Sequence, residues 1–220
     1  MYLPSYFAVD DLDRVAEFVD RIGAADIVTF DGTAMTSSLV PVIWDRPSDT
    51  PGRLFAHIAR ANTQWQTAHT DVPALAIVHG PQAYISPSWY PSKHEHGRAV
   101  PTWNYASVHF TGSITFHTDA EWLRDIVTRL TARYEEHRPD RWHVDDAPPA
   151  YVDGQLRGIV GVEIAIASVE AKAKLSQNRG AADQAGVIAG LRDEGDSRAA
   201  EVARLMERAA ENAAENRPRH

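Results

Sequence analysis

Cysteine is absent from this chain of 220 residues, which excludes a disulfide framework, a thiolate metal site and a cysteine nucleophile. No apolar run is long enough to cross a bilayer, and the first residues lack the basic and then apolar pattern of a secretory leader. The formal net charge is -8, so the basic stripe of a nonspecific nucleic-acid binder is not expected. These absences predict a cytoplasmic protein that does not contact membranes.

Several motifs of well-known enzyme classes are also missing. The chain has no Gly-x-Gly-x-x-Gly and no Walker-type loop, which argues against Rossmann and P-loop folds. It has no Gly-x-Ser-x-Gly elbow and no His-Glu-x-x-His, so a serine hydrolase and a zinc peptidase are unsupported. The histidines are isolated from one another, and we predict neither a metal site nor a catalytic side chain.

What the chain does contain is typical of a mainly β protein. Hydrophobic residues make up 44% and charged residues 24%, enough for one good-sized core. Asp31-Gly32 lies between two apolar runs and predicts a hairpin, and residues 103–117 alternate as a long strand does. Strands outnumber helices and follow one another through tight turns. This pattern favours an antiparallel barrel with peripheral helices over a doubly wound parallel sheet.

The composition changes near residue 180. From Ala181 onward the chain is rich in Ala, Glu, Arg and Asp, and Val202, Leu205, Met206 and Ala209 keep a weak helical period. We therefore expect a main domain at 1–179 and a peripheral helical tail at 180–220.

A first set of polar residues suits a phosphate. Three adjacent hydroxyls lie on the second expected strand, and a cluster with Arg60 and Gln64 bridges a strand and a helix start, where backbone amides attract anions. Taken singly, each has an ordinary explanation, such as a solvated strand face or a helix cap. From this set we predict the following ligand-binding residues: Thr36, Ser37, Ser38, His57, Arg60, Asn62 and Trp65.

A second set suits a planar, anionic ligand. Aromatic faces beside amides and cations can bind a heterocycle that carries a phosphate. The alternatives are a half-buried aromatic strand and a solvated strand exit. The predicted binding residues of this set are Trp103, Asn104, Tyr105, Lys174, Gln177 and Arg179.

Five strings, in this order along the chain, resemble the PaiB-type FMN-binding negative transcriptional regulators. They are residues 57–65, 80–86, 100–105, 157–161 and 174–179. The resemblance extends from Met1 to about Arg179. It implies a six-stranded antiparallel Greek-key split β-barrel with outer helices, and a homodimer with FMN at the subunit interface. It also implies a repressor role, and with that role DNA as a partner. This expectation of DNA binding rests on the resemblance alone.

The resemblance also suggests how the predicted residues divide the ligand. Arg60, Ser37 and Ser38 would hold the phosphate, the 103–105 string would line the ring pocket, and Lys174, Gln177 and Arg179 would close the site. Three other hypotheses stay open at this point. They are a flavin-dependent oxidoreductase, whose reactivity would come from the cofactor, a dimer without any cofactor, and a haem-binding barrel with an axial ligand from among His57, His79 and His109.

Overall fold

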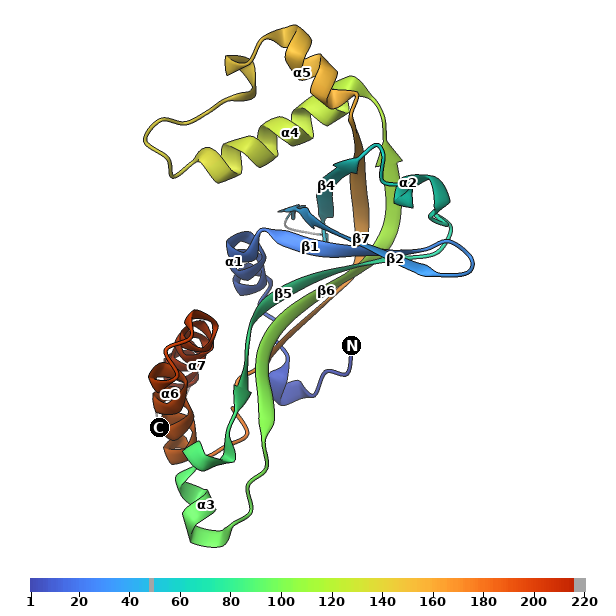
Figure 1. Ribbon diagram of the computed structural model, residues 1–220. Helices are drawn as coiled ribbons and strands as arrows, with labels where there is room; N and C mark the ends of the chain where they lie inside the picture. Colours follow the sequence, from blue (N-terminus) through green and yellow to red (C-terminus); the bar gives the residue numbers. More distant parts are fainter. Residues whose placement is uncertain (48–49, 216–220) are drawn as a thin grey trace. The chain divides into compact units, whose positions relative to one another are not determined.

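The computed structural model of the chain describes residues 1–47 and 50–215 (Figure 1). The strands are β1 (Ala24–Phe30), β2 (Met35–Pro41), β3 (Ile43–Asp45), β4 (Arg53–Ala59), β5 (Ala74–Ile85), β6 (Thr102–His117) and β7 (Ile159–Lys174). The α-helices are α1 (Leu12–Ile22), α2 (Gln64–Thr67), α3 (Pro91–His96), α4 (Ala120–Glu135), α5 (Pro149–Leu156), α6 (Ala181–Asp193) and α7 (Ser197–Glu215). Short 3-10 helices are η1 (Ser5–Phe7), η2 (Pro87–Trp89) and η3 (Val144–Asp146).

The strands form one antiparallel sheet in the order β2-β1-β5-β6-β7-β4-β3. The mainly β fold is therefore confirmed, with seven strands in place of the expected six. The extra strand arises because β2 stops pairing with β1 at Pro41. The next residue, Val42, donates its amide to the Gly23 carbonyl at 2.9 Å, outside the paired residues of the two strands. The short β3 that follows pairs with β4.

The hairpin between β1 and β2 forms where Asp31-Gly32 predicts it. The Asp31 carboxylate accepts from the amides of Thr33 and Ala34 at 2.8 and 2.7 Å. Gly32 has a φ of +93°, a conformation that glycine adopts without steric cost. The hairpin sets β1 and β2 in a register with Ile27 opposite Ser38 and Val28 opposite Ser37.

Two compact units make up the chain, and each is described by itself. The first comprises residues 1–12, 79–108 and 170–220, and the second comprises residues 13–78 and 109–169. Strands β5, β6 and β7 contribute residues to both units. These units do not follow the expected boundary at residue 179.

In the first unit, the C-terminal helices form the core with the strand ends. Val187 and Leu191 of α6 and Val202 of α7 are fully buried and pack with Ile85 and Leu175. Gly190 has the Trp89 indole directly against it, where a Cβ atom would lie only 2.4 Å from the ring. The tail is helical as predicted, but the expectation that it is peripheral is wrong. The small residues of the tail let its helices pack closely against Trp89 and the strand ends. A weak helical period in the sequence does not reveal this packing.

In the second unit, the side chains of the sheet alternate between a core face and a face packed on α4. Phe55 of β4 contacts Ile126 and Leu130 of α4. Gly161 of β7 lies against Trp122, where a Cβ atom would come within 2.0 Å of the indole. Glycine at this position therefore lets α4 reach the sheet.

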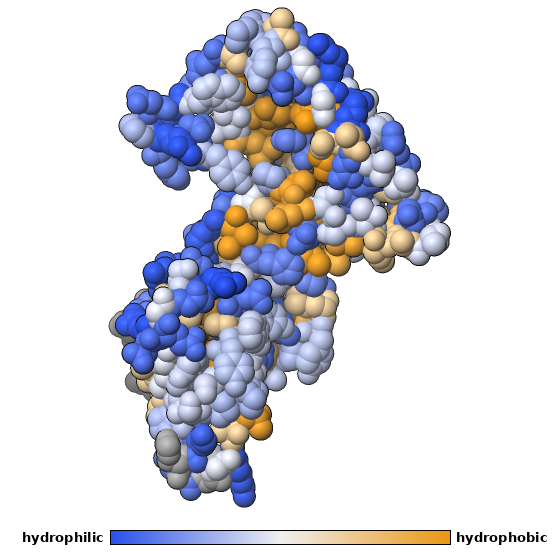
Figure 2. Space-filling view, in the orientation of Figure 1, coloured by the Kyte–Doolittle hydropathy of each residue, from blue (hydrophilic) through white to orange (hydrophobic). Residues whose placement is uncertain are grey.

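Part of this sheet is apolar and uncovered. Met35 and Leu39 of β2 are 72% and 70% exposed. The neighbouring strands continue the same face with half-buried apolar side chains, and Figure 2 shows hydrophobic residues gathered over β1. We call this set the open sheet face; its apolar members are Val28, Phe30, Met35, Leu39, Leu75 and Ile77.

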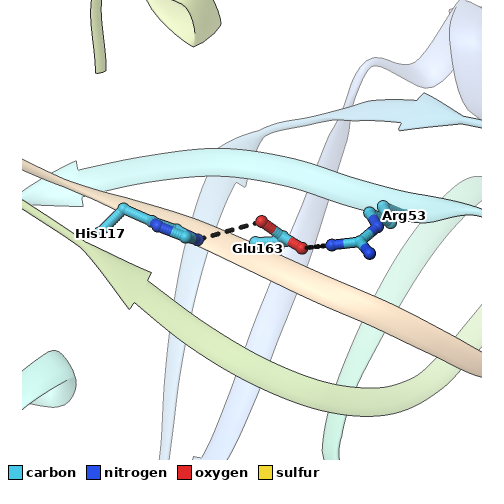
Figure 3. A network of polar contacts seen from close by, with 3 residues as sticks. All are labelled: Arg53, His117 and Glu163. Atoms are coloured by element: carbon cyan, nitrogen blue, oxygen red, sulfur yellow. Dashed lines mark hydrogen bonds and ion pairs between the residues drawn. The ribbon is translucent and has the colours of Figure 1, made fainter. Parts of the chain in front are cut away.

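One buried carboxylate joins three strands of the second unit (Figure 3). Glu163 of β7 forms an ion pair with Arg53 of β4, and its second oxygen lies 3.0 Å from Nε2 of His117 on β6. The His117 ring stacks on Trp122 with centroids 4.1 Å apart. A buried carboxylate is costly unless it is paired, so the strands must keep this alignment.

Within the part of the chain that the structure describes, every helix is too short or too polar to span a membrane.

Candidate functional site

In the second unit, Asn62 joins β2 to the start of α2. Its side-chain amide donates to the Ser38 hydroxyl at 2.8 Å, and its oxygen accepts from the Gln64 amide at 3.0 Å. An asparagine that follows a strand can form such a local bond and start a helix. The predicted residues Ser38 and Asn62 are therefore in direct contact.

Arg60 lies two residues before Asn62 and is fixed by its own turn. Its Nε donates to the Arg157 carbonyl at 2.7 Å, and its guanidinium carbon lies 6.0 Å from the centroid of the Trp65 ring. The Trp65 indole in turn donates to the Arg60 carbonyl at 3.0 Å. No described residue accepts from the two terminal nitrogens of Arg60, which can therefore bind an anion.

The three adjacent hydroxyls of β2 do not act together. Because side chains alternate along a strand, Thr36 and Ser38 share one face and Ser37 lies on the other. The Ser37 hydroxyl donates to the Asp26 carboxylate at 3.2 Å. The structure therefore brings Ser38 to Asn62 and directs Ser37 to an acidic neighbour, a poor environment for a phosphate.

Gln64 belongs to this group, although the sequence assigned it no binding role. Its side chain is buried, and Nε2 donates to the carbonyls of Ile27 and Thr36 and to the Thr29 hydroxyl at 2.9 to 3.2 Å. Two carbonyl partners fix the amide orientation, because only the nitrogen can donate to them. Its Oε1 is left as a buried acceptor without a partner among the described residues. The sequence signal for Gln64 is its place in the cluster with Arg60, within the 57–65 string.

This group fits a flavin mononucleotide on chemical grounds. A buried acceptor without a donor costs free energy, and a polyol hydroxyl or a ring N–H would satisfy it. The phosphate needs cationic and hydroxyl donors, and Arg60 and Ser38 supply them. We therefore take Arg60, Asn62, Gln64 and Ser38 as the polar site of the second unit.

His57 has a different environment. It lies on the face of β4 that carries Phe55, the face packed on α4, and it is opposite Gly161 of β7. Burial lowers the pKa of its imidazole below the ordinary value of 6.5, so the ring is neutral near pH 7. Of the other two histidines considered as haem ligands, His79 is exposed and His109 is half-buried.

In the first unit, the 103–105 string is divided between the two faces of β6. Trp103 is 46% exposed, forms an edge contact with Tyr84 and donates to Gln82 at 3.0 Å. Asn104 is fully buried, and its amide nitrogen donates to the Ser176 hydroxyl and the Met206 sulfur. Both amide protons of Asn104 are therefore used inside the core, whereas Trp103 is open to a ligand.

The Tyr105 ring lies next to a buried cation. It belongs to the outer face of β6 with Trp103, and the Lys172 ammonium is 5.3 Å from its centroid. The same ammonium lies 5.5 Å from the Tyr2 ring and donates to the Tyr2 carbonyl at 2.9 Å. Lys172 thereby holds the N-terminal segment against this face.

The residues expected to close the site have mostly internal contacts. Lys174 donates to the Thr102 hydroxyl at 2.5 Å and to the Trp103 carbonyl at 2.6 Å. Burial, and then the charges of Lys172 and Arg179, lower the pKa of Lys174. Gln177 accepts from the Leu175 amide and donates to the Ala173 carbonyl, so it stabilises its own turn.

Solved structures of other proteins share this split-barrel architecture. The flavocytochrome Anf3 from Azotobacter vinelandii has a TM-score of 0.57 at 13% identity, covering 76% of this chain and 69% of that chain. An FAD and heme binding protein from Mycobacterium smegmatis has a TM-score of 0.56 at 14% identity, covering 81% of this chain and 78% of that chain. These likenesses establish the fold alone.

Sequence comparison gives the family. The chain belongs to the family described as "Putative FMN-binding domain", whose model matches residues 1–168. It is 33% identical over 207 residues to the protease synthase and sporulation protein PAI 2 of Bacillus subtilis, covering 94% of this chain and 97% of that protein. The resemblance seen in the five strings is therefore confirmed.

The lowered pKa of His57 predicts a pH effect on stability. The unfolded chain takes up this proton at higher pH than the folded chain, so the free energy of unfolding falls as pH drops below about 6.5. His57→Gln should flatten that decline in urea titrations between pH 8 and pH 5. The exposed His137, changed to Gln, is the matched control and should leave the decline intact. Equal curves for wild type and His57→Gln would contradict the assignment.

Proposed function

We propose that this chain binds FMN, and that Arg60, Ser38, Asn62 and Gln64 hold its phosphate and polyol. The observation that carries the proposal is the unpartnered Oε1 of Gln64, with Arg60, whose terminal nitrogens are open, four residues earlier in the chain. Membership of an FMN-binding family supports the same ligand. The bound flavin supplies a redox-active ring, and these residues bind and orient it.

We further propose, for the first unit by itself, that Trp103 and Tyr105 offer stacking faces to a planar ring, with Lys174 close to Trp103. The exposed Trp103 indole and the outer-face position of Tyr105 support this part. Asn104, Ser37 and Gln177 are left out of the proposed site, because their polar groups bind within the protein.

Arg60→Gln should weaken FMN binding by at least about 10-fold, because a charge-assisted bond to the phosphate is lost. Riboflavin lacks the phosphate, so its affinity should stay the same. Flavin fluorescence quenching measures both dissociation constants, and Arg138→Gln is the control because Arg138 is well exposed in the segment after α4.

Two results would count against this site. The first is wild-type protein that does not quench FMN fluorescence. The second is an Arg60→Gln variant that loses FMN and riboflavin equally, which would indicate a folding defect. Haem is tested in the same preparation, since a Soret band abolished by His57→Gln would favour haem over flavin.

We propose that two copies of the chain associate through the open sheet face. Monomers seldom expose so many apolar side chains on three adjacent strands, and such a face, here interrupted only by Asp26 and Ser37 among its paired positions, usually marks an interface. A second copy is the occupant we favour, because the edge strand β2 offers a self-complementary apolar surface.

Leu39→Glu should shift the chain toward monomer and raise the dimer dissociation constant by about 10-fold or more, because the new carboxylate would be buried in the interface. Light scattering after size exclusion measures the mass over a concentration series. Tyr151→Glu, at a similarly exposed position of α5, should leave the mass unchanged. A wild-type protein that stays monomeric at every concentration would exclude this interface.

We also propose a role in gene regulation in the cytoplasm. Support comes from the sporulation role in the name of the Bacillus subtilis relative. Because the net charge is -8, any contact with DNA must be made by a local cluster of cationic side chains. Selection from a random pool of duplex DNA, with and without FMN, should enrich a defined sequence. A pool that stays random in both arms would remove direct DNA binding from the proposal.

A further inference from the structure

The first six residues of the chain, which we call the strap, belong to the first unit and are attached to it at few points. None of them is buried, and Tyr2 and Tyr6 are 84% and 57% exposed. The anchor follows directly after the strap. Phe7 is buried, Ala8 forms an isolated bridge with Lys172 of β7, and the Val9 amide donates to the β7 backbone at 3.0 Å. The strap can therefore move while residues 7–9 stay in place.

One buried cation holds the strap. Lys172 is 8% exposed, and its ammonium donates to the Tyr2 carbonyl at 2.9 Å. Three aromatic rings surround this ammonium. Their centroids lie 5.3 Å away for Tyr105, 5.5 Å for Tyr2 and 6.0 Å for Phe7. Of these partners, the strap supplies one ring and the hydrogen-bond acceptor, and Phe7 and Tyr105 stay with the body of the unit.

The neighbouring charges leave Lys172 dependent on the strap. Glu170, two residues earlier on β7, forms its ion pair with the amino group of Met1. Among the described residues, the Tyr2 carbonyl is the one acceptor for the Lys172 ammonium. A buried ammonium is costly without a hydrogen bond, so a strap that lifts must leave another acceptor in its place.

The same cation borders the stacking face proposed for the first unit. Tyr105 shares the outer face of β6 with Trp103, and its ring contacts the Lys172 ammonium. A planar ring with carbonyl oxygens, placed on Tyr105, would offer this ammonium an acceptor and an aromatic face. Those are the two contacts that Tyr2 makes now.

We propose that the strap is a lid on the Tyr105 face, and that a planar heteroaromatic ligand opens it by replacing Tyr2 at Lys172. This inference rests on the proposed stacking role of Trp103 and Tyr105. Lys172 keeps an acceptor and three rings in both states, so the lid opens without leaving the buried cation unpaired. The exchange involves the ligand ring and not its phosphate, so riboflavin opens the strap as FMN does.

Hydrogen exchange of the full chain tests the hold of Lys172 on the strap. The Phe7 and Ala8 amides donate to the carbonyls of Pro4 and Ser5, so a peptide over residues 1–9 reports lifting. Lys172→Met keeps an apolar stem and removes the ammonium, and exchange in this peptide should become at least about 10-fold faster. Lys93→Met, at an exposed position of α3, is the matched control and should exchange as wild type does.

A second variant tests the opening by a ligand. Tyr2→Ala removes one ring at an exposed position, so the core of the unit stays intact. Because the closed state loses a contact, opening costs less, and the riboflavin dissociation constant should fall by about 3-fold or more. Tyr151→Ala, at an exposed position of α5, should leave it unchanged. In wild type, saturating riboflavin should speed exchange in the 1–9 peptide.

Three outcomes would overturn the lid. The first is wild-type exchange in the 1–9 peptide of Lys172→Met, which would show that Lys172 does not hold the strap. The second is slower exchange with riboflavin, or weaker riboflavin binding by Tyr2→Ala, which would show that the strap closes on the ligand. The third is flavin binding with no change in either measurement, which would leave the proposed function standing and remove the lid. Wild-type protein that binds neither flavin would overturn both.

Discussion

The register between β4 and β7 determines the geometry of the second unit. Seven residue pairs run from Arg53 opposite Ala165 to Ala59 opposite Ile159. The amide of the next residue, Arg60, donates to the Gly158 carbonyl at 2.8 Å and so extends this pairing. The Arg60 guanidinium lies beside Arg157, because its Nε donates to the Arg157 carbonyl. A slip of one residue would turn the buried Glu163 away from Arg53 and move every side chain to the opposite face. The ion network and the polar site therefore depend on one strand pairing.

Polar groups in the described core are almost all paired, and one of the two exceptions, Oε1 of Gln64, carries the functional argument. Oε1 of Gln64 and the hydroxyl of Tyr90 have no partner among the described residues, and one lies in each unit. Unsatisfied buried groups are expensive to keep. For Gln64, a ligand that donates a hydrogen bond to Oε1, as proposed for FMN, would remove this cost.

The C-terminal helices show how the sequence can hide a core. Alanine is frequent in both α6 and α7, and α6, which also contains two glycines, has only a weak apolar period. They nevertheless bury Val187, Leu191, Val202 and Ala203 completely, because small residues let two helices and Trp89 approach closely. Met206 from α7 reaches the Asn104 amide, so the tail also contributes to the polar interior. The segment is thus part of the first unit's structure.

The sequence by itself determined the mainly β class, the hairpin at Asp31-Gly32, the helical tail and the family, because turn chemistry, periodicity and long strings are local properties. It also located the Arg60–Asn62 turn correctly. The tertiary structure alone decided that Ser38 and not Ser37 meets Asn62, that Asn104 lies inward and Trp103 outward, and that Gln64 and Tyr90 are unpaired. The physical reason is that a strand pattern gives two alternating faces, but only the packing of its neighbours decides which face is buried and which polar atoms find partners.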